Sequence, residues 1–197
     1  PSIDHSSYFQ LKADSIGKEI HETDILYVGN SYLDSWGYKK ALLMNHFVNY
    51  DFELYGNPAW KRWFKFFPEL EKKFRGVDHI PTETLNKMFN KAKIIPVDGN
   101  PGIINGIHAR ALEALGSGAL PLIEYRKDRD NIIFKGFGSE LPFIQNYSKA
   151  KDVAEYYLSH DTERKDLTVK MKDFINAKYN PKDNAALILD NINAKGK

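Results

Sequence analysis

The sequence lacks cysteine, long hydrophobic runs and a large excess of charge of either sign. Without cysteine it cannot form a disulfide scaffold, a thiolate metal site or a cysteine nucleophile. Its longest apolar runs, such as Ile25–Val28 and Ala119–Ile123, have the length of strands, whereas a membrane-spanning helix needs about 18 apolar residues. The 28 Lys and Arg residues nearly balance 26 Asp and Glu residues, which argues against a protein that wraps DNA or RNA.

Several short motifs of enzyme chemistry are absent as well. The six histidines show no HExxH or other metal-ligand spacing, and the segment 29–37 lacks the G-x-G-x-x-G pattern of dinucleotide sites. The run 116–118, Gly-Ser-Gly, is too short for the G-x-S-x-G turn of serine hydrolases. We therefore expect neither a bound metal nor a nicotinamide or flavin cofactor.

The beginning of the sequence gives little information on location. The first residue is Pro1, and no basic-then-apolar signal sequence follows it. The sequence is compatible with a piece of a longer protein. We expect a cytoplasmic protein, with peripheral contact at the inner face of the membrane as an alternative.

Short β-rich apolar runs alternate with stretches of helical periodicity along most of the chain. Hydrophobicity is continuous within these runs, which is typical of parallel strands covered by helices on both faces. The pattern predicts an α/β fold with a doubly wound parallel sheet. The predicted strands are Ile25–Val28, Phe52–Tyr55, Val77–Ile80, Lys93–Val97, Ala119–Ile123 and Pro142–Ile144.

The composition along the chain divides it into three parts. Residues 1–21 are polar and weakly patterned, and we interpret them as an N-terminal arm or hinge. Residues 22–147 carry the alternating pattern of the α/β domain. From residue 148 to residue 197 the pattern is purely helical, which predicts a C-terminal extension whose helices pack on the same domain.

The segment from Asp98 to Gly106 follows a predicted strand and is rich in glycine. Ligands of open parallel sheets bind beyond the carboxyl ends of the strands. The segment leads into a helix predicted from about Gly106 to Ser117, whose N-terminus favours an anion such as a diphosphate. The alternative is an ordinary turn between a strand and a helix.

Spacings of three and four residues place Gly106, Arg110, Glu113 and Ser117 on one face of that helix. Glu113 would lie about 10 Å along the axis from the helix start, which is about the distance from a diphosphate to the ribose of the same nucleotide. A carboxylate can accept hydrogen bonds from two ribose hydroxyls, and Arg110 can neutralise phosphate charge. The alternative is a surface Arg–Glu pair of little energetic value.

The run 105–123 resembles the donor-binding signature of GT-B glycosyltransferases, in which a helix with Glu-Ala-Leu precedes a strand. It resembles more narrowly the CgeB-type group of spore-maturation proteins, with the pattern Asn-x-Arg-x-x-Glu-Ala-Leu-x-x-Gly. Here the matching residues run from His108 through Arg110 and Glu113 to Gly118. The similarity extends from about residue 22 to residue 192, and it implies the Rossmann-like C-terminal half of a bacterial GT-B enzyme.

The resemblance implies transfer of a sugar from a nucleoside diphosphate, linked to UDP or GDP, onto a hydroxyl of a glycan, protein or other acceptor. It implies that Glu113 binds the ribose, that Arg110 lies near the phosphates and that the segment 102–106 holds the diphosphate. The residues expected to line the donor pocket with them are Asn30, Gly102, Asn105, Gly106 and His108. It also implies no metal and a missing N-terminal acceptor domain.

Two departures from the family pattern stand within this signature. Retaining GT-B enzymes often have a glutamate eight positions before the ribose glutamate, and here that position is Asn105. His108 replaces the Asn of the narrower group. The first departure leaves the stereochemistry open, and the second leaves the exact donor contacts open. The sequence also identifies no catalytic base. The competing interpretation is a non-catalytic ligand-binding or assembly module with the same fold, because fold alone does not establish function.

The stretch from Trp60 to Phe67 interleaves aromatic residues with Lys and Arg. The spacing of Trp60, Trp63, Phe64 and Phe67 predicts the buried face of a short helix, with the cations in water. An interface with the missing domain and contact with an anionic membrane surface are the two alternatives.

Overall fold

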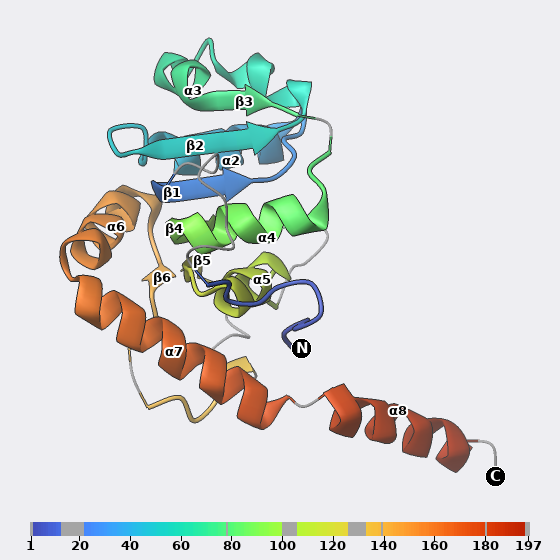
Figure 1. Ribbon diagram of the computed structural model, residues 1–197. Coiled ribbons are helices and arrows are strands. Elements are labelled where there is room, and N and C mark those ends of the chain that lie inside the picture. The colour runs from blue at the N-terminus through green and yellow to red at the C-terminus, as the bar shows by residue number, and fades with distance from the viewer. Residues whose placement is uncertain are drawn as a thin grey trace.

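The computed structural model describes residues 2–12, 22–77, 79–99, 106–125, 133–138, 140–179 and 181–195. A parallel sheet of six strands forms its centre, as the sequence pattern predicts (Figure 1). The strands are β1 (Thr23–Val28), β2 (Phe52–Gly56), β3 (Phe74–Gly76), β4 (Ala92–Val97), β5 (Leu120–Glu124) and β6 (Phe143–Ile144).

The strand order β3-β2-β1-β4-β5-β6 makes the fold Rossmann-like. The chain proceeds outward from β1 to β3 and then returns to β4 on the other side of β1. This reversal places a topological switch point between the carboxyl ends of β1 and β4, where α/β proteins bind their ligands. Ile25 lies opposite Ile94 in that central pair.

Helices cover both faces of the sheet. Helix α2 lies on one face, and α4 and α5 lie on the other (Figure 1). Helix α7 packs against α5 and β5. The α-helices are α2 (Ser35–Asn45), α3 (Pro68–Lys73), α4 (Thr82–Lys91), α5 (Arg110–Ser117), α6 (Ala150–Ser159), α7 (Asp161–Lys178) and α8 (Pro181–Lys195), and the 3-10 helices are η1 (Pro58–Trp63) and η3 (Tyr147–Lys149).

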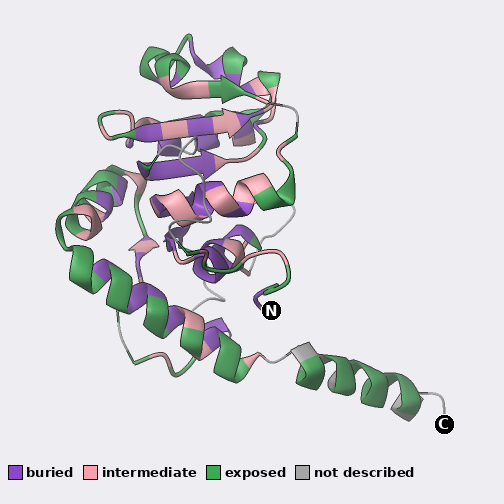
Figure 2. Cartoon of the chain, viewed as in Figure 1, coloured by how far each residue is buried: buried purple, intermediate pink, exposed green. Residues whose placement is uncertain are grey.

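The last helix differs from the rest in its surroundings. Figure 2 shows buried residues along the sheet and on the inner sides of α5 and α7, whereas α8 extends away from the body and is exposed. Ile188, Leu189 and Ile192 on α8 all face solvent. No helix in the described part of the chain is both long and apolar enough to cross a membrane.

Most boundaries agree with the sequence prediction to within about two residues, but one strand and one helix differ by more. The third strand is Phe74–Gly76 rather than Val77–Ile80. It is a short edge strand with two exposed residues, so it lacks the apolar run that marks a buried strand. Helix α5 begins at Arg110 rather than near Gly106, because Gly106 has a φ of 106°, which an α-helix does not accommodate.

Candidate functional site

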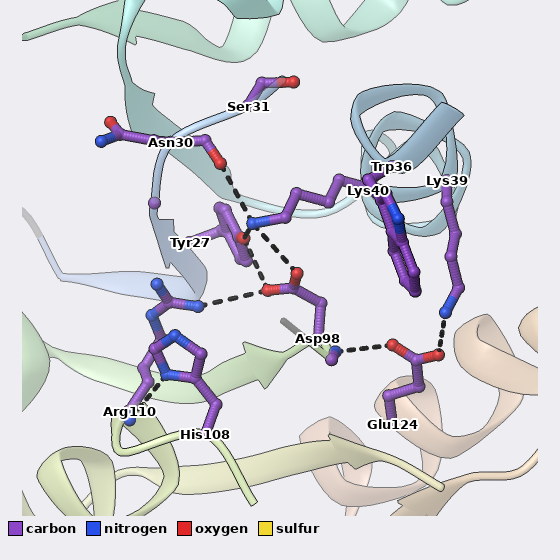
Figure 3. A network of polar contacts seen from close by, with 12 residues as sticks. Tyr27, Asn30, Ser31, Trp36, Lys39, Lys40, Asp98, His108, Arg110 and Glu124 are labelled. Atoms are coloured by element: carbon purple, nitrogen blue, oxygen red, sulfur yellow. Dashed lines mark hydrogen bonds and ion pairs between the residues drawn. The ribbon is translucent and has the colours of Figure 1, made fainter. Parts of the chain in front are cut away.

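Three side chains converge on one buried carboxylate at the switch point (Figure 3). The Tyr27 hydroxyl, near the end of β1, donates a hydrogen bond of 2.6 Å to Asp98 Oδ1. Arg110 of α5 donates to the same oxygen at 3.2 Å, and Lys40 Nζ of α2 lies 3.1 Å from Asp98 Oδ2. Asp98 directly follows β4. Four elements of the fold thus meet at a single charged group.

This cluster holds more positive than negative charge. Asp98, Lys40 and Arg110 are all buried, with exposed fractions of 3%, 8% and 8%. Burial raises the pKa of Asp98, but Lys40 and Arg110 outweigh burial and hold that pKa below its usual value. Burial, reinforced by Asp98, raises the pKa of Tyr27 well above its usual value, so the phenol is neutral. One carboxylate therefore balances two buried cations, an arrangement that attracts an anion.

The close approach of Arg110 to β1 depends on a glycine. A Cβ atom at Gly29 would lie 2.8 Å from the Arg110 Nη2 atom and 2.9 Å from the Tyr27 hydroxyl oxygen. Any side chain at this position would displace the guanidinium group. Gly29 therefore leaves the space that the guanidinium group occupies.

The aromatic stretch holds the loop that follows β1. Trp60 and Trp63 are buried, as the sequence predicts, together with Phe64 and Phe67. The Trp60 indole N–H donates to the carbonyl oxygen of Gly29 at 2.8 Å, and the Trp63 indole N–H donates to that of Tyr32 at 2.9 Å. These indoles lie in the interior, with the cations of the stretch exposed, which is the arrangement that the spacing predicts. Their function in the fold is to fix residues 29–32.

A second carboxylate anchors the beginning of the segment after β4. Glu124, at the end of β5, accepts the backbone N–H of Gly99 at 2.7 Å through Oε2. Its Oε1 atom lies 2.5 Å from Lys39 Nζ of α2 (Figure 3). The end of β4 is thus connected to both α2 and β5.

A pocket of about 400 Å³ opens beside the charged cluster. Its lining includes four of the predicted site residues, Asn30, His108, Arg110 and Glu113, and it also includes Lys40. Gly106 is not part of the lining of this pocket. The predictions for Gly102 and Asn105 lie outside the described residues.

Glu113 and Arg110 do not form the surface pair that the sequence left open. Arg110 is buried and pairs with Asp98. Glu113 lies on the first turn of α5, so the expected distance of about 10 Å from the helix start is wrong. Burial raises the pKa of Glu113, and Arg110 opposes that rise. Within the described residues no side chain donates a hydrogen bond to its carboxylate, which leaves it available to hydroxyl groups in the pocket.

A comparison with models of protein families assigns the chain to one family. The family model described as glycosyl transferase-like matches residues 39–190. The chain belongs to this glycosyl transferase-like family. A comparison with curated protein sequences gave no match.

Solved structures share the fold of this family member. The sucrose-phosphate synthase of Thermosynechococcus elongatus is 15% identical, with a TM-score of 0.68 over 99% of this chain and 51% of that one. The C-terminal domain of a glycosyl transferase group 1 family protein of Francisella tularensis is 12% identical, with a TM-score of 0.60 over 90% of this chain and 98% of that one. A mutant of BGT from T4 phage, in complex with UDP-glucose, is 21% identical, with a TM-score of 0.60 over 86% of this chain and 46% of that one.

The chain spans about half the length of the first and third of these structures. Together with the family match, they show the C-terminal domain fold of GT-B glycosyltransferases, which the sequence resemblance implied. Membership of the CgeB-type group stays a prediction.

His108 lies before α5 of this glycosyl transferase-like domain and is neutral. Its Nδ1 atom accepts the backbone N–H of Arg110 at 3.1 Å, so a proton on the ring belongs to Nε2. Burial, reinforced by the Arg110 charge, lowers the pKa of His108 to about 4. In the unfolded chain a histidine titrates near pH 6.5.

This difference between the pKa of His108 in the folded and in the unfolded chain predicts that the protein becomes less stable in acid. Between about pH 6.5 and 4 the unfolded state binds the His108 proton more readily, so the free energy of unfolding falls as the pH falls. We expect His108→Asn to lose less stability than the wild type between about pH 7 and 4.5, measured by urea unfolding. The exposed residue His160 supplies the control, His160→Asn. Equal losses in wild type and His108→Asn would contradict the prediction.

Sequence reasoning missed Lys40, Asp98 and Tyr27. A tyrosine within an apolar strand and an aspartate at a strand end are signals that could have indicated the last two. Lys40 has no comparable signal, because it is one of two adjacent lysines on α2 and only the fold shows which of them points inward.

Proposed function

We propose that the chain is the donor-binding domain of a glycosyltransferase and that the pocket beside Asp98 binds a nucleoside diphosphate sugar, linked to UDP or GDP. The observation that carries this proposal is the excess of buried positive charge at the switch point, next to an available carboxylate. A diphosphate matches the charge, and a ribose presents two adjacent hydroxyls to the carboxylate.

In this proposal Arg110 and Lys40 contact the diphosphate, and Glu113 accepts hydrogen bonds from the ribose. Asn30 and His108 line the same pocket. The pattern from His108 to Gly118 supports the CgeB-type group within the family. The resemblance implies Gly102, Asn105 and Gly106 as further donor-binding residues.

The two cations, Arg110 and Lys40, also have a chemical role in sugar transfer. When the bond between the sugar and the diphosphate breaks, negative charge grows on the departing nucleoside diphosphate. Arg110 and Lys40 are fixed by Asp98 before any ligand arrives, so they stabilise this charge without reorganising. No metal or cofactor is part of this proposal. The acceptor hydroxyl and the base that deprotonates it belong to a second domain.

Calorimetry on the 197-residue chain tests the proposal with UDP, GDP and inorganic diphosphate. We expect Glu113→Gln to weaken binding of the nucleoside diphosphate about 10- to 100-fold, because a hydrogen bond to a charged group contributes about 1.5–3 kcal/mol. Binding of inorganic diphosphate should not weaken, since it has no ribose and the substitution removes a negative charge near Arg110.

The control is Glu83→Gln on α4, where the carboxylate is exposed and pairs with Lys87. It should leave all affinities unchanged. A wild-type chain that binds neither UDP nor GDP would overturn the proposed function and favour a non-catalytic module.

A further inference from the structure

The segment 2–12 runs beside α5 (Figure 1) and contacts both α4 and α5. Its backbone is held by two asparagine side chains of α4. Asn86 Oδ1 accepts the N–H of Phe9 at 3.3 Å, and Asn90 Oδ1 accepts the N–H of Leu11 at 2.8 Å. Asn90 also donates to the carbonyl oxygen of Phe9 at 3.0 Å. These bonds fix the path of the segment.

Helix α5 has a glycine where the segment crosses it. A Cβ atom at Gly116 would lie 2.7 Å from the carbonyl oxygen of Tyr8 and 2.9 Å from the Ile3 side chain. Ile3 is buried, with an exposed fraction of 3%. The helix therefore leaves room for this segment, which packs as part of the domain.

The path of the segment brings the Tyr8 ring into the pocket. Tyr8 stacks on Phe89 of α4, with ring centroids 6.2 Å apart and an angle of 29° between the planes. It lines the pocket together with Glu113, Ile80 and Leu85. Burial, followed by the Glu113 charge, raises the pKa of Tyr8, so the phenol sits close enough to sense that carboxylate.

The residues that line the pocket thus supply two kinds of chemistry. Lys40 and Arg110 supply positive charge, whereas Tyr8, Phe89, Ile80 and Leu85 supply aromatic and apolar surface. Glu113 lines the same pocket and interacts electrostatically with both Arg110 and Tyr8. A nucleoside diphosphate has groups that match each of these: anionic phosphates, ribose hydroxyls and a flat aromatic base.

We propose that Tyr8 contacts the nucleoside of the donor, so that the segment 2–12 forms part of the donor site rather than a free arm. This inference rests on the proposed function of the pocket. Stacking and apolar contact suit a base, and Tyr8 offers a partly exposed ring for them, whereas the Phe89 ring against which it packs is buried.

The first experiment measures UDP and inorganic diphosphate binding to Tyr8→Ala by calorimetry. We expect UDP affinity to fall about tenfold, which is the effect of losing one base–aromatic contact, while diphosphate affinity stays unchanged. Phe9→Ala is the matched control, because Phe9 is on the same segment but is exposed and does not line this pocket. It should bind both ligands as the wild type does. If thermal unfolding shows that Tyr8→Ala is not folded, Tyr8→Leu takes its place.

A second variant moves Tyr8 without changing it. Gly116→Val should push the segment off α5, because its side chain needs the space of the Tyr8 carbonyl and of Ile3. We expect the same selective loss of UDP affinity.

The outcomes separate this inference from the proposed function. If wild type binds no nucleoside diphosphate, the proposed function fails. If wild type binds UDP but Tyr8→Ala and Gly116→Val bind it equally well, only the inference is overturned. Equal weakening of UDP and inorganic diphosphate would also overturn it, because the loss would not come from the nucleoside.

Discussion

Replacing Arg110 by Met is expected to weaken the binding of UDP about 100-fold, since losing one partner of a buried charged contact costs about 2–5 kcal/mol. The guanidinium group of Arg110 is buried, is fixed by Asp98 and lines the pocket. A methionine side chain keeps much of the apolar volume of arginine but removes the positive charge and the planar set of N–H donors. Calorimetry at fixed salt concentration measures the change, because phosphate contacts depend on ionic strength.

The matched control is Lys93→Met at the amino end of β4, the end opposite to the site. Lys93 Nζ lies 2.7 Å from Asp24 Oδ1 and connects β4 to β1, the same strands that meet at the site. This variant removes one cation from the chain without touching the pocket, so UDP affinity should not change. An Arg110→Met chain that unfolds at the wild-type temperature and still binds UDP as the wild type does would contradict the role of Arg110.

Replacing Asp98 by Ala is expected to lower the free energy of unfolding by about 3–5 kcal/mol, because it leaves buried charges without a partner. Asp98 accepts a hydrogen bond from Tyr27 and forms ion pairs with Lys40 and Arg110. Its side chain is 3% exposed, so the carboxylate balances the two cations inside the protein rather than at its surface. Urea unfolding at neutral pH measures the loss.

Asp24→Ala is the control for that loss. Its partner Lys93 is partly exposed, so breaking this pair should cost about 1 kcal/mol or less. Inorganic diphosphate should raise the unfolding temperature of Asp98→Ala more than that of the wild type, because it can neutralise the unpaired Lys40 and Arg110. If Asp98→Ala proves as stable as Asp24→Ala, the contribution of the buried cluster to the free energy of unfolding does not depend on Asp98.

The sheet could be predicted because its central strands are continuously apolar. Both β4 and β5 read as buried strands in the sequence, and they pair in the structure. The edge strand β3 could not be predicted in the same way, since two of its three residues are exposed. The start of α5 was missed because the glycine content of the preceding segment does not show where a positive φ will fall.

Within the site, the sequence indicated the residues that belong to one local motif. His108, Arg110 and Glu113 stand within six positions, so helical spacing and the family resemblance both apply to them. Lys40 and Tyr8 lie far from this motif in the sequence, and only the packing of α2 and of the segment 2–12 brings them to the pocket. Their contribution follows from tertiary contacts that no local pattern encodes.

The bonds from the two buried indoles to the loop after β1 have an experimental consequence. The chain has three tryptophans, and the third, Trp36, lies in the first turn of the helix that carries Lys40. Trp60 and Trp63 bond to Gly29 and Tyr32, which line the proposed donor pocket, so each indole is connected to an element of that site. Intrinsic emission should provide an optical signal for ligand arrival, without a label and without an acceptor substrate.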